Sequence, residues 1–264
     1  MDYFPQLLSA CAAQYPLRRK HSVRCVIART EDGRREKYLD AARKHTIWEL
    51  QYSGLTGEEL ESILSLFHGV EGQLKPFTFI DPAGNLLAWS EGLSQPAWSV
   101  GPLITVTGGQ PDPLGGARAT HLANGGGASQ EAAQTLALPA SYRYSFSLYA
   151  RSAAETEIAL IRRSPARTDT LTAAIGNQWQ RIKHSARLDT ADETVTFAIE
   201  IPAAGQVTVF GLQAEAQPDA SEYKRTTSRN GAYPGTHFLD DHVTPVTTGP
   251  GEHALALRLI SRWN

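Results

Sequence analysis

Long apolar segments are absent from this sequence. No run approaches the roughly 20 apolar residues that a membrane-spanning helix needs. The opening stretch, MDYFPQLLSACAAQYPLRRK, has an acid at Asp2 and a proline at Pro5, where a secretory leader would have basic residues followed by a longer apolar run. We therefore expect a soluble chain that is made in the cytosol and has no membrane partner.

The sequence also has few cysteines and a small net charge. The two cysteines, Cys11 and Cys25, cannot form the framework of a disulfide-rich domain, and without a second pair of ligands they make no zinc site. We expect them to be buried or inert thiols. The formal net charge of −2 gives no overall attraction to nucleic acid or to anionic lipid, so any partner must be recognised locally.

The signatures of common enzymes are missing as well. The sequence has no G-x-S-x-G nucleophile elbow, and its glycine-rich GGARATH lacks the lysine of a phosphate-binding loop. A pair of carboxylates for glycoside hydrolysis stays open, but no pair stands out, and Glu200 and Glu215 would be arbitrary choices. We therefore expect no catalytic residue and no cofactor.

The segment HFLDDH, residues 237–242, is the strongest candidate for a metal site. In an extended chain, alternation sends His237 and Asp241 to one face. Asp240 and His242 then lie on the opposite face, so the four side chains cannot converge on one ion. We expect no metal here.

What the sequence does contain is the pattern of a mainly β protein. Its 264 residues are long for one domain and comfortable for two. The stretch 22–30 predicts a strand that ends at EDG, and Trp48, Leu50 and Tyr52 alternate with polar residues as in a half-buried strand. We expect these two strands to pair in antiparallel fashion.

One helix is predicted, over TGEELESILSLFHG. Leu60, Ile63, Leu64 and Phe67 recur at helical spacing. Thr56 with a glutamate three residues later forms a capping box, and Gly69 or Gly72 ends the helix.

From residue 89 onward, short alternating stretches are separated by glycine and proline turns. Residues 142–150 and 195–201 alternate over their whole length, and further strands are predicted at 156–163, 169–175, 179–188 and 252–263. In QVTVFGLQAEA the alternation of apolar and polar residues shifts by one position beside Gly211, which predicts a β-bulge. Many short strands at near-regular spacing favour a β-sandwich of jelly-roll type for about residues 89–225.

Tryptophans of this region are candidates for sugar binding, because exposed aromatic faces stack on pyranose rings. Trp98 lies in the proline-rich QPAWSV and is the better candidate for exposure, with Trp89 as a second candidate. Trp179 is expected to be a core residue. Packing in the core is the alternative for all three.

The N-terminal third resembles the distal tail and minor tail proteins of tailed bacteriophages and gene transfer agents. The likeness rests on KHTIWELQYSGLTGEELESILSLFHGVEGQLKPFTFIDPAGN and, near the C-terminus, on THFLDDHVTPVTTGPGEHALALRLI. The middle region is similar to carbohydrate-binding-like jelly rolls of phage tail proteins, through SFSLYAR, WQRI, VTVFGLQAEA and SEYKRTT. The residues that match the tail-protein pattern are Leu60, Leu64, Phe67, Gly72, Phe77, Phe79, Asp81, Phe238 and Asp240 or Asp241.

The resemblance implies a discontinuous tail domain, a β-sandwich or barrel with one helix, built from residues 1–88 and 226–264. The jelly roll of residues 89–225 would be inserted into it. Members form a ring, commonly a hexamer, between the tail tube and the hub or baseplate at the tail tip, with the inserted module projecting outward. The chain would then be a structural virion protein, assembled in the bacterial cytoplasm, and no enzyme.

Two alternatives stay open. The first is a stand-alone carbohydrate-binding or adhesin-like protein, and the second is a β-sandwich enzyme that processes glycans. The jelly roll would bind a host-surface polysaccharide in the first, whereas in a tail ring it could also be purely structural.

Overall fold

The computed structural model describes residues 2–9 and 11–262 and contains two compact units. The split unit consists of the chain up to Ile80 together with the chain from Ala232 onward. The second unit, Asp81–Gly231, is a sandwich of two sheets. The protein is therefore mainly β with one helix among its described residues, as predicted. No helix within those residues is long and apolar enough to cross a membrane.

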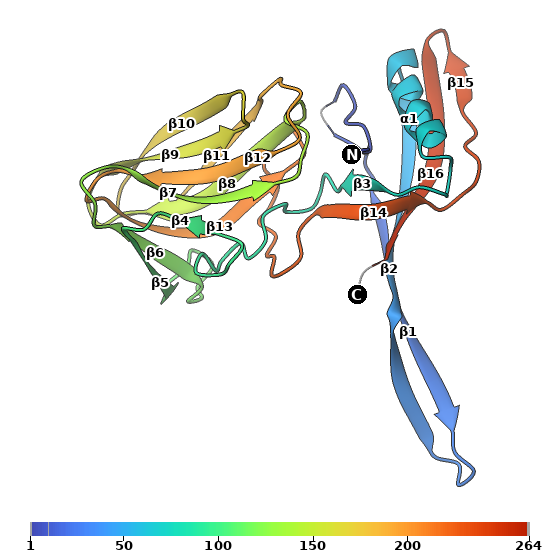
Figure 1. Ribbon diagram of the computed structural model, residues 1–264, viewed down its shortest axis with the longest axis horizontal. Helices are drawn as coiled ribbons and strands as arrows, with labels where there is room; N and C mark the ends of the chain where they lie inside the picture. Colours follow the sequence, from blue (N-terminus) through green and yellow to red (C-terminus); the bar gives the residue numbers. More distant parts are fainter. Residues whose placement is uncertain (1, 10, 263–264) are drawn as a thin grey trace. The chain divides into compact units, whose positions relative to one another are not determined.

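The split unit is built on a six-stranded antiparallel sheet that joins both ends of the chain. The strand order is β1-β2-β16-β14-β3, and β15 pairs with β16. Figure 1 shows the early strands in blue and the late strands in red within this one sheet. The strands are β1 (Arg18–Arg29), β2 (Arg35–Leu55), β3 (Phe77–Ile80), β14 (Ala232–Phe238), β15 (Val246–Gly249) and β16 (Glu252–Arg262).

Helix α1 (Gly57–Gly69) is confirmed with the predicted cap. The Thr56 side chain accepts from the backbone N–H of Glu59, and the Glu59 side chain accepts from the backbone N–H of Thr56. Leu60, Ile63 and Phe67 are buried in the core of the split unit. The capping box therefore starts the helix, and its apolar face holds it on the sheet.

Strands β1 and β2 are longer than the sequence predicted, and they form an extended hairpin. Their antiparallel pairing, which was predicted, runs from Arg18 opposite Glu49 to Arg29 opposite Arg35. We call residues 18–45 the hairpin arm; in Figure 1 its far end extends past the other strands of the split unit. The large apolar side chains exposed on the arm are Val23, Val26, Ile27, Tyr38 and Leu39.

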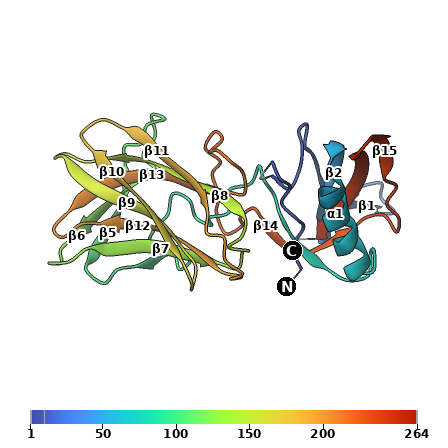
Figure 2. The ribbon, with the colours of Figure 1, turned by 90° about the horizontal axis from the view of Figure 1, so that it is seen from above.

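The second unit is a jelly-roll sandwich of two five-stranded antiparallel sheets (Figure 2). The β12 sheet has the order β10-β9-β12-β7-β4, and the β13 sheet has the order β11-β8-β13-β6-β5. Five of the strands were not singled out from the sequence: β4 (Ser99–Val100), β5 (Ile104–Gln110), β6 (Ala119–Asn124), β7 (Gln130–Leu136) and, in the split unit, β15. The predicted strands are β8 (Arg143–Arg151), β9 (Thr156–Arg163), β10 (Thr168–Ile175), β11 (Gln180–Arg187), β12 (Val195–Ile201) and β13 (Gln206–Glu215).

Every second side chain of these strands points inward and fills the space between the two sheets. Phe197 and Ile199 of β12 are fully buried, as are Phe146 and Leu148 of β8 in the opposite sheet. The predicted bulge is also present: the pairing of β13 with β8 shifts register between Phe210 and Gln213, around Gly211. Gly211 has φ +64°, and a Cβ atom there would lie 3.1 Å from the ring of Tyr223, so glycine is required.

The boundary between the two units differs from the predicted one, which lay at 88/89 and 225/226. Asn85, expected in the split unit, donates through Nδ2 to the carbonyl of Leu212 at 3.0 Å and accepts from the N–H of Ala214 at 3.1 Å. The backbone N–H of Leu86 also donates to the carbonyl of Ala214, at 2.7 Å. Residues 81–88 are thus tied to β13 and belong to the sandwich.

Candidate functional site

Trp98 does not offer a face for sugar stacking. Its side chain is 5% exposed, and its indole N–H donates to the backbone oxygen of Trp89 at 3.1 Å. The expectation that Trp98 is exposed is therefore wrong, because the turns after β3 fold over the ring and satisfy its only polar group. Trp89 itself is half-buried and has φ +51°.

The aromatic residues of the tail-protein pattern form one cluster in the split unit. The ring of Phe238 lies 5.0 Å from that of Phe77 and 5.1 Å from that of Phe67, measured between centroids. Phe79 is fully buried beside Phe4. Gly72 has φ +65°, and a Cβ there would touch Phe67 at 3.4 Å. These residues build the core of the split unit.

The acidic residues of that pattern have separate local partners. Asp81 is buried and accepts from the N–H of Ala83 at 3.0 Å, which shapes the turn after β3. Asp240 forms an ion pair with Arg258, which lowers the pKa of the Asp240 carboxyl. Asp241 accepts from His242 at 2.8 Å, and this hydrogen bond lowers the pKa of the Asp241 carboxyl. No three His, Cys, Asp or Glu side chains within residues 2–9 and 11–262 are placed to share a metal.

The two carboxylates considered for glycoside hydrolysis lie on different sheets. Glu200 is on the outer face of the β12 sheet, whereas Glu215 is on β13 in the other sheet. Glu215 has a fully buried carboxylate, held by Lys224 at 2.7 Å and by the N–H of Ser221 at 2.9 Å. The pair cannot flank one sugar, and Glu215 locks the segment after β13 in place.

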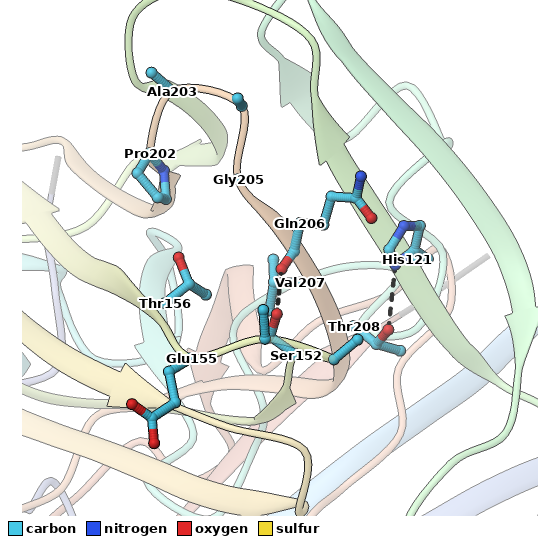
Figure 3. A pocket seen from close by; sticks show the side chains of 13 residues that line it. His121, Ser152, Glu155, Thr156, Pro202, Ala203, Gly205, Gln206, Val207 and Thr208 are labelled. Carbon is cyan, nitrogen blue, oxygen red and sulfur yellow. Dashed lines mark hydrogen bonds between the residues drawn. The ribbon is translucent and has the colours of Figure 1, made fainter.

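A pocket of about 490 Å³ opens at one end of the sandwich (Figure 3). It lies between the loop joining β8 to β9, the turn joining β12 to β13, and the neighbouring part of β6. Six of its thirteen lining residues have polar side chains. These are His121, Ser152, Glu155, Thr156, Gln206 and Thr208.

Hydrogen bonds hold the pocket in shape. The hydroxyl of Ser152 donates to the backbone oxygen of Gln206 at 2.8 Å, and Nδ1 of His121 lies 3.3 Å from the hydroxyl oxygen of Thr208 (Figure 3). Behind the turn, Asn124 is 3% exposed, and its Nδ2 donates to the carbonyls of Ile201 and Pro202 at 3.1 and 2.9 Å. The polar groups of the pocket are therefore positioned before any ligand arrives.

Two further depressions, of about 510 and 280 Å³, lie on the outer face of the β12 sheet. They share Ser129 and Glu200, and the smaller one reaches Pro202 and Ala203, which also line the end pocket. Beside the larger one, Arg163 makes a two-pronged ion pair with Glu131, at 2.8 and 3.1 Å. None of the lining residues of the three depressions is a phenylalanine, tyrosine or tryptophan, so a ligand there would be held by hydrogen bonds.

Sequence reasoning missed the residues of the end pocket. His121, Ser152, Gln206 and Thr208 come from two strands and a loop, and none belongs to a recognisable motif. The only available signal was that they fall at strand ends, beside the Pro-Ala-Ala-Gly turn at 202–205. Their grouping depends on which strands pair, and that information is not local.

The two cysteines are free thiols. Cys25 is exposed on the hairpin arm, and Cys11 is half-buried. Burial raises the pKa of the Cys11 thiol, so at neutral pH it is protonated and unreactive.

Comparison with known proteins gives distant structural neighbours. No protein-family model matches the sequence, and no curated protein does. A solved tailspike protein 4 domain of bacteriophage CBA120, described as enzymatically active, is 15% identical with a TM-score of 0.43; the match covers 52% of this chain and 22% of that one.

Carbohydrate-binding modules also occur among these neighbours. The C-terminal family 22 module of a Clostridium thermocellum protein is 16% identical with a TM-score of 0.44, and the match covers 53% of this chain and 99% of that one. A xylan-binding domain of Paenibacillus barcinonensis is 15% identical with a TM-score of 0.40, and the match covers 53% and 98% of the two chains.

Proposed function

We propose that the protein binds carbohydrate through its sandwich. The observation that carries this proposal is the pre-shaped polar pocket at the end of the sandwich. Pockets for apolar ligands are lined mainly by hydrophobic side chains. Here six of the thirteen lining residues carry hydroxyl, amide, imidazole or carboxylate groups, which suits a ligand that is rich in hydroxyl groups.

The end pocket opens at the surface of the sandwich, so it can hold part of a chain and not only a single sugar. We place the protein among binding proteins rather than enzymes, since Glu200 and Glu215, the carboxylates considered for hydrolysis, do not face each other.

Affinity electrophoresis through gels that contain single polysaccharides tests this function. We expect the full chain to be retarded by at least one bacterial surface polysaccharide. The substitutions Gln206→Ala and Thr208→Ala should reduce that retardation. The control substitution Thr247→Ala, in the split unit, should leave it unchanged. A folded wild-type chain that no polysaccharide retards would contradict the proposal.

A second function, assembly into a ring, is favoured by the hairpin arm. A two-stranded hairpin is only marginally stable in water by itself, yet this one exposes Val26 and Tyr38 on one face and Ile27 and Leu39 on the other. Exposed apolar patches of this kind are typical of interaction surfaces. The arm therefore needs a partner to cover it.

Charge points to a second copy of this chain as that partner. Residues 18–45 contain 10 lysines and arginines and 4 acids, a net charge of +6. The remaining sequence contains 15 basic and 23 acidic residues, a net charge of −8. Opposite charge favours docking of the arm on the body of a neighbouring copy, and repetition of one such head-to-tail contact closes a ring.

In this second function the chain is a component of a phage or phage-like tail. It would form a ring, such as a hexamer, at the tail tip between the tube and the hub, after assembly in the bacterial cytoplasm. Its sandwich would then carry the carbohydrate-binding site. The two functions therefore use different units of the same protein.

Light scattering during size-exclusion chromatography tests the assembly. We expect an oligomer for the wild-type chain and a monomer for the double variant Ile27→Glu, Leu39→Glu, because the charges replace apolar contacts. Leu74→Glu, at another exposed apolar position of the split unit, is the control and should remain oligomeric. A monomeric wild-type chain, or an arm that retains nucleic acid instead of a second copy, would contradict this function.

A further inference from the structure

Four side chains form a row across the outer face of the β13 sheet, next to the end pocket. Arg151 of β8 pairs with Thr208 of β13, and Thr208 pairs with His121 of β6. Leu148 and Ala150 are fully buried, so Arg151 faces outward. Trp179, just before β11, completes the row, with its ring centroid 4.8 Å from the Arg151 guanidinium carbon.

Arg151 is the unusual member of this row. Its guanidinium lies over the Trp179 ring, and among the described residues no hydrogen bond or ion pair engages its N–H groups. Other arginines of the sandwich are paired, as Arg162 is with Asp169 and Arg163 with Glu131. Stacking on an aromatic ring fixes a guanidinium plane while leaving its N–H groups free to bind an anion.

The two outer faces of the sandwich have opposite charge. Among the outward positions of its strands, the β13 sheet carries one acid, Glu215, which is buried and paired with Lys224. The outward basic residues of that sheet are Arg143, Arg151, Arg181, Lys183 and Arg187. The outward charged residues of the β12 sheet are Glu131, Glu157, Glu200 and Arg163. An anionic ligand is therefore attracted to the β13 sheet and repelled by the β12 sheet.

We propose that the row is a binding site for an acidic polysaccharide, whose sugar carboxylates are held by Arg151. The planar guanidinium can donate two parallel hydrogen bonds to one carboxylate. His121 and Thr208 contact the sugar hydroxyls, and the end pocket, which they also line, accommodates the next sugar along the chain. This inference rests on the proposed carbohydrate binding and specifies the class of carbohydrate and the face.

The aromatic contribution is secondary to the ionic one. Trp179 is half-exposed, and the Arg151 guanidinium covers one of its faces. The ring therefore acts mainly by orienting Arg151, and Trp179 is a positioning residue. Removing the ring should weaken binding of acidic sugars but leave the dependence of binding on salt, since the charge of Arg151 remains.

Isothermal titration calorimetry with the full chain tests this site. The acidic probes are oligomers of polygalacturonate and alginate, and the neutral probes are oligomers of xylan and dextran. We expect an acidic probe to bind and the neutral probes to bind at least tenfold more weakly. Arg151→Gln should weaken acidic binding by roughly tenfold or more, the loss expected for one charge-assisted contact.

Arg163→Gln is the matched control, because it removes the same charge from the opposite face of the sandwich. Its affinity for the acidic probe should stay within about twofold of wild type, since that face does not contact the ligand. Arg151→Lys keeps the charge but loses the planar fork, so we expect an intermediate affinity. Thermal unfolding without ligand shows whether Arg151→Gln folds. If it does not fold, the affinity of Arg151→Lys tests the site instead.

Each possible result either supports the proposed site or contradicts it. Equal weakening by Arg151→Gln and Arg163→Gln, or full affinity in either Arg151 variant, would overturn the site. Binding of neutral probes alone would overturn it as well, while the proposed carbohydrate binding would stand. Absence of binding to every acidic and neutral probe and to the wider panel of polysaccharides would remove both.

Discussion

The rings of Phe77 and Phe238 lie 5.0 Å apart between centroids, although the whole sandwich separates them in the sequence. Phe77 belongs to β3, the last strand before the sandwich, and Phe238 to β14, the first strand after it. Both side chains are 2% exposed. This contact joins the two halves of the split unit, whose strands β3 and β14 pair in one sheet.

Phe238→Ala should lower the free energy of unfolding of the split unit by about 3–5 kcal/mol, the usual cost of emptying a buried phenylalanine site. The substitution removes contacts with Phe67 and Phe77 together. Chemical denaturation measures the change. Leu74→Ala, at a side chain that is 68% exposed, should change stability by less than about 0.5 kcal/mol, and an equal effect of both substitutions would show that the aromatic cluster is unimportant.

Removal of the sandwich should leave a folded split unit. Ile80 and Ala232 are directly opposite each other in the antiparallel pairing of β3 with β14. A two-residue Asn-Gly turn between them therefore replaces Asp81–Gly231 without a change of register. We expect this shortened chain to show β-rich circular dichroism and cooperative thermal unfolding. Loss of both would mean that the split unit depends on the sandwich for folding.

Asn124→Ala should destabilise the sandwich by roughly 1–3 kcal/mol, because it leaves buried carbonyl groups without donors. The carbonyls concerned belong to Ile201, Pro202 and Ala128. Because Ile201 and Pro202 adjoin the end pocket, the same variant should also weaken polysaccharide binding. Asn177→Ala, at an exposed position, serves as the comparison and should match wild type in thermal unfolding and in binding.

The stability of the sandwich should fall with pH below about 6.5, the ordinary pKa of histidine. Burial, and secondarily the charge of Arg162, lower the pKa of His184, against the opposing effect of its hydrogen bond to Asp169. The unfolded chain then binds more protons than the folded one, so stability is full above the unfolded pKa and declines as pH falls toward the folded pKa.

Thermal unfolding across this pH range measures the effect. His184→Gln removes the titrating group, so its melting temperature should depend less on pH than that of wild type. His253→Gln, in the split unit, should keep the wild-type pH dependence of the sandwich transition. If His184→Gln kept the wild-type pH dependence, other groups would cause the loss of stability at low pH.

Local signals in the sequence were sufficient for elements that depend on neighbouring residues. Thr56 and Glu59 identified the start of α1, because a capping box is made within four residues. Gly211 identified the bulge in β13, since the change of alternation is visible in the sequence. The alternation of Phe197 and Ile199 likewise predicted which face of β12 is buried.

Features that depend on distant partners were predicted poorly. Trp98 was expected to be exposed, but its indole N–H finds the Trp89 carbonyl within a fold of turns that carries no periodic pattern. The hairpin arm was underestimated because its strands bury no apolar face, and alternation is the signal by which strands are recognised. The row of Arg151, Thr208 and His121 exists only through the register of three strands.

The central claim is that the two units have separate functions: the sandwich binds polysaccharide, and the split unit forms the oligomer. Its most direct test compares three chains by affinity electrophoresis and light scattering: the full protein, residues 81–231 alone, and the split unit closed by Asn-Gly. The account predicts that residues 81–231 are monomeric and bind polysaccharide as the full chain does, and that the closed split unit forms the oligomer without binding. Polysaccharide binding that stays with the split unit, or is lost from folded residues 81–231, would contradict it.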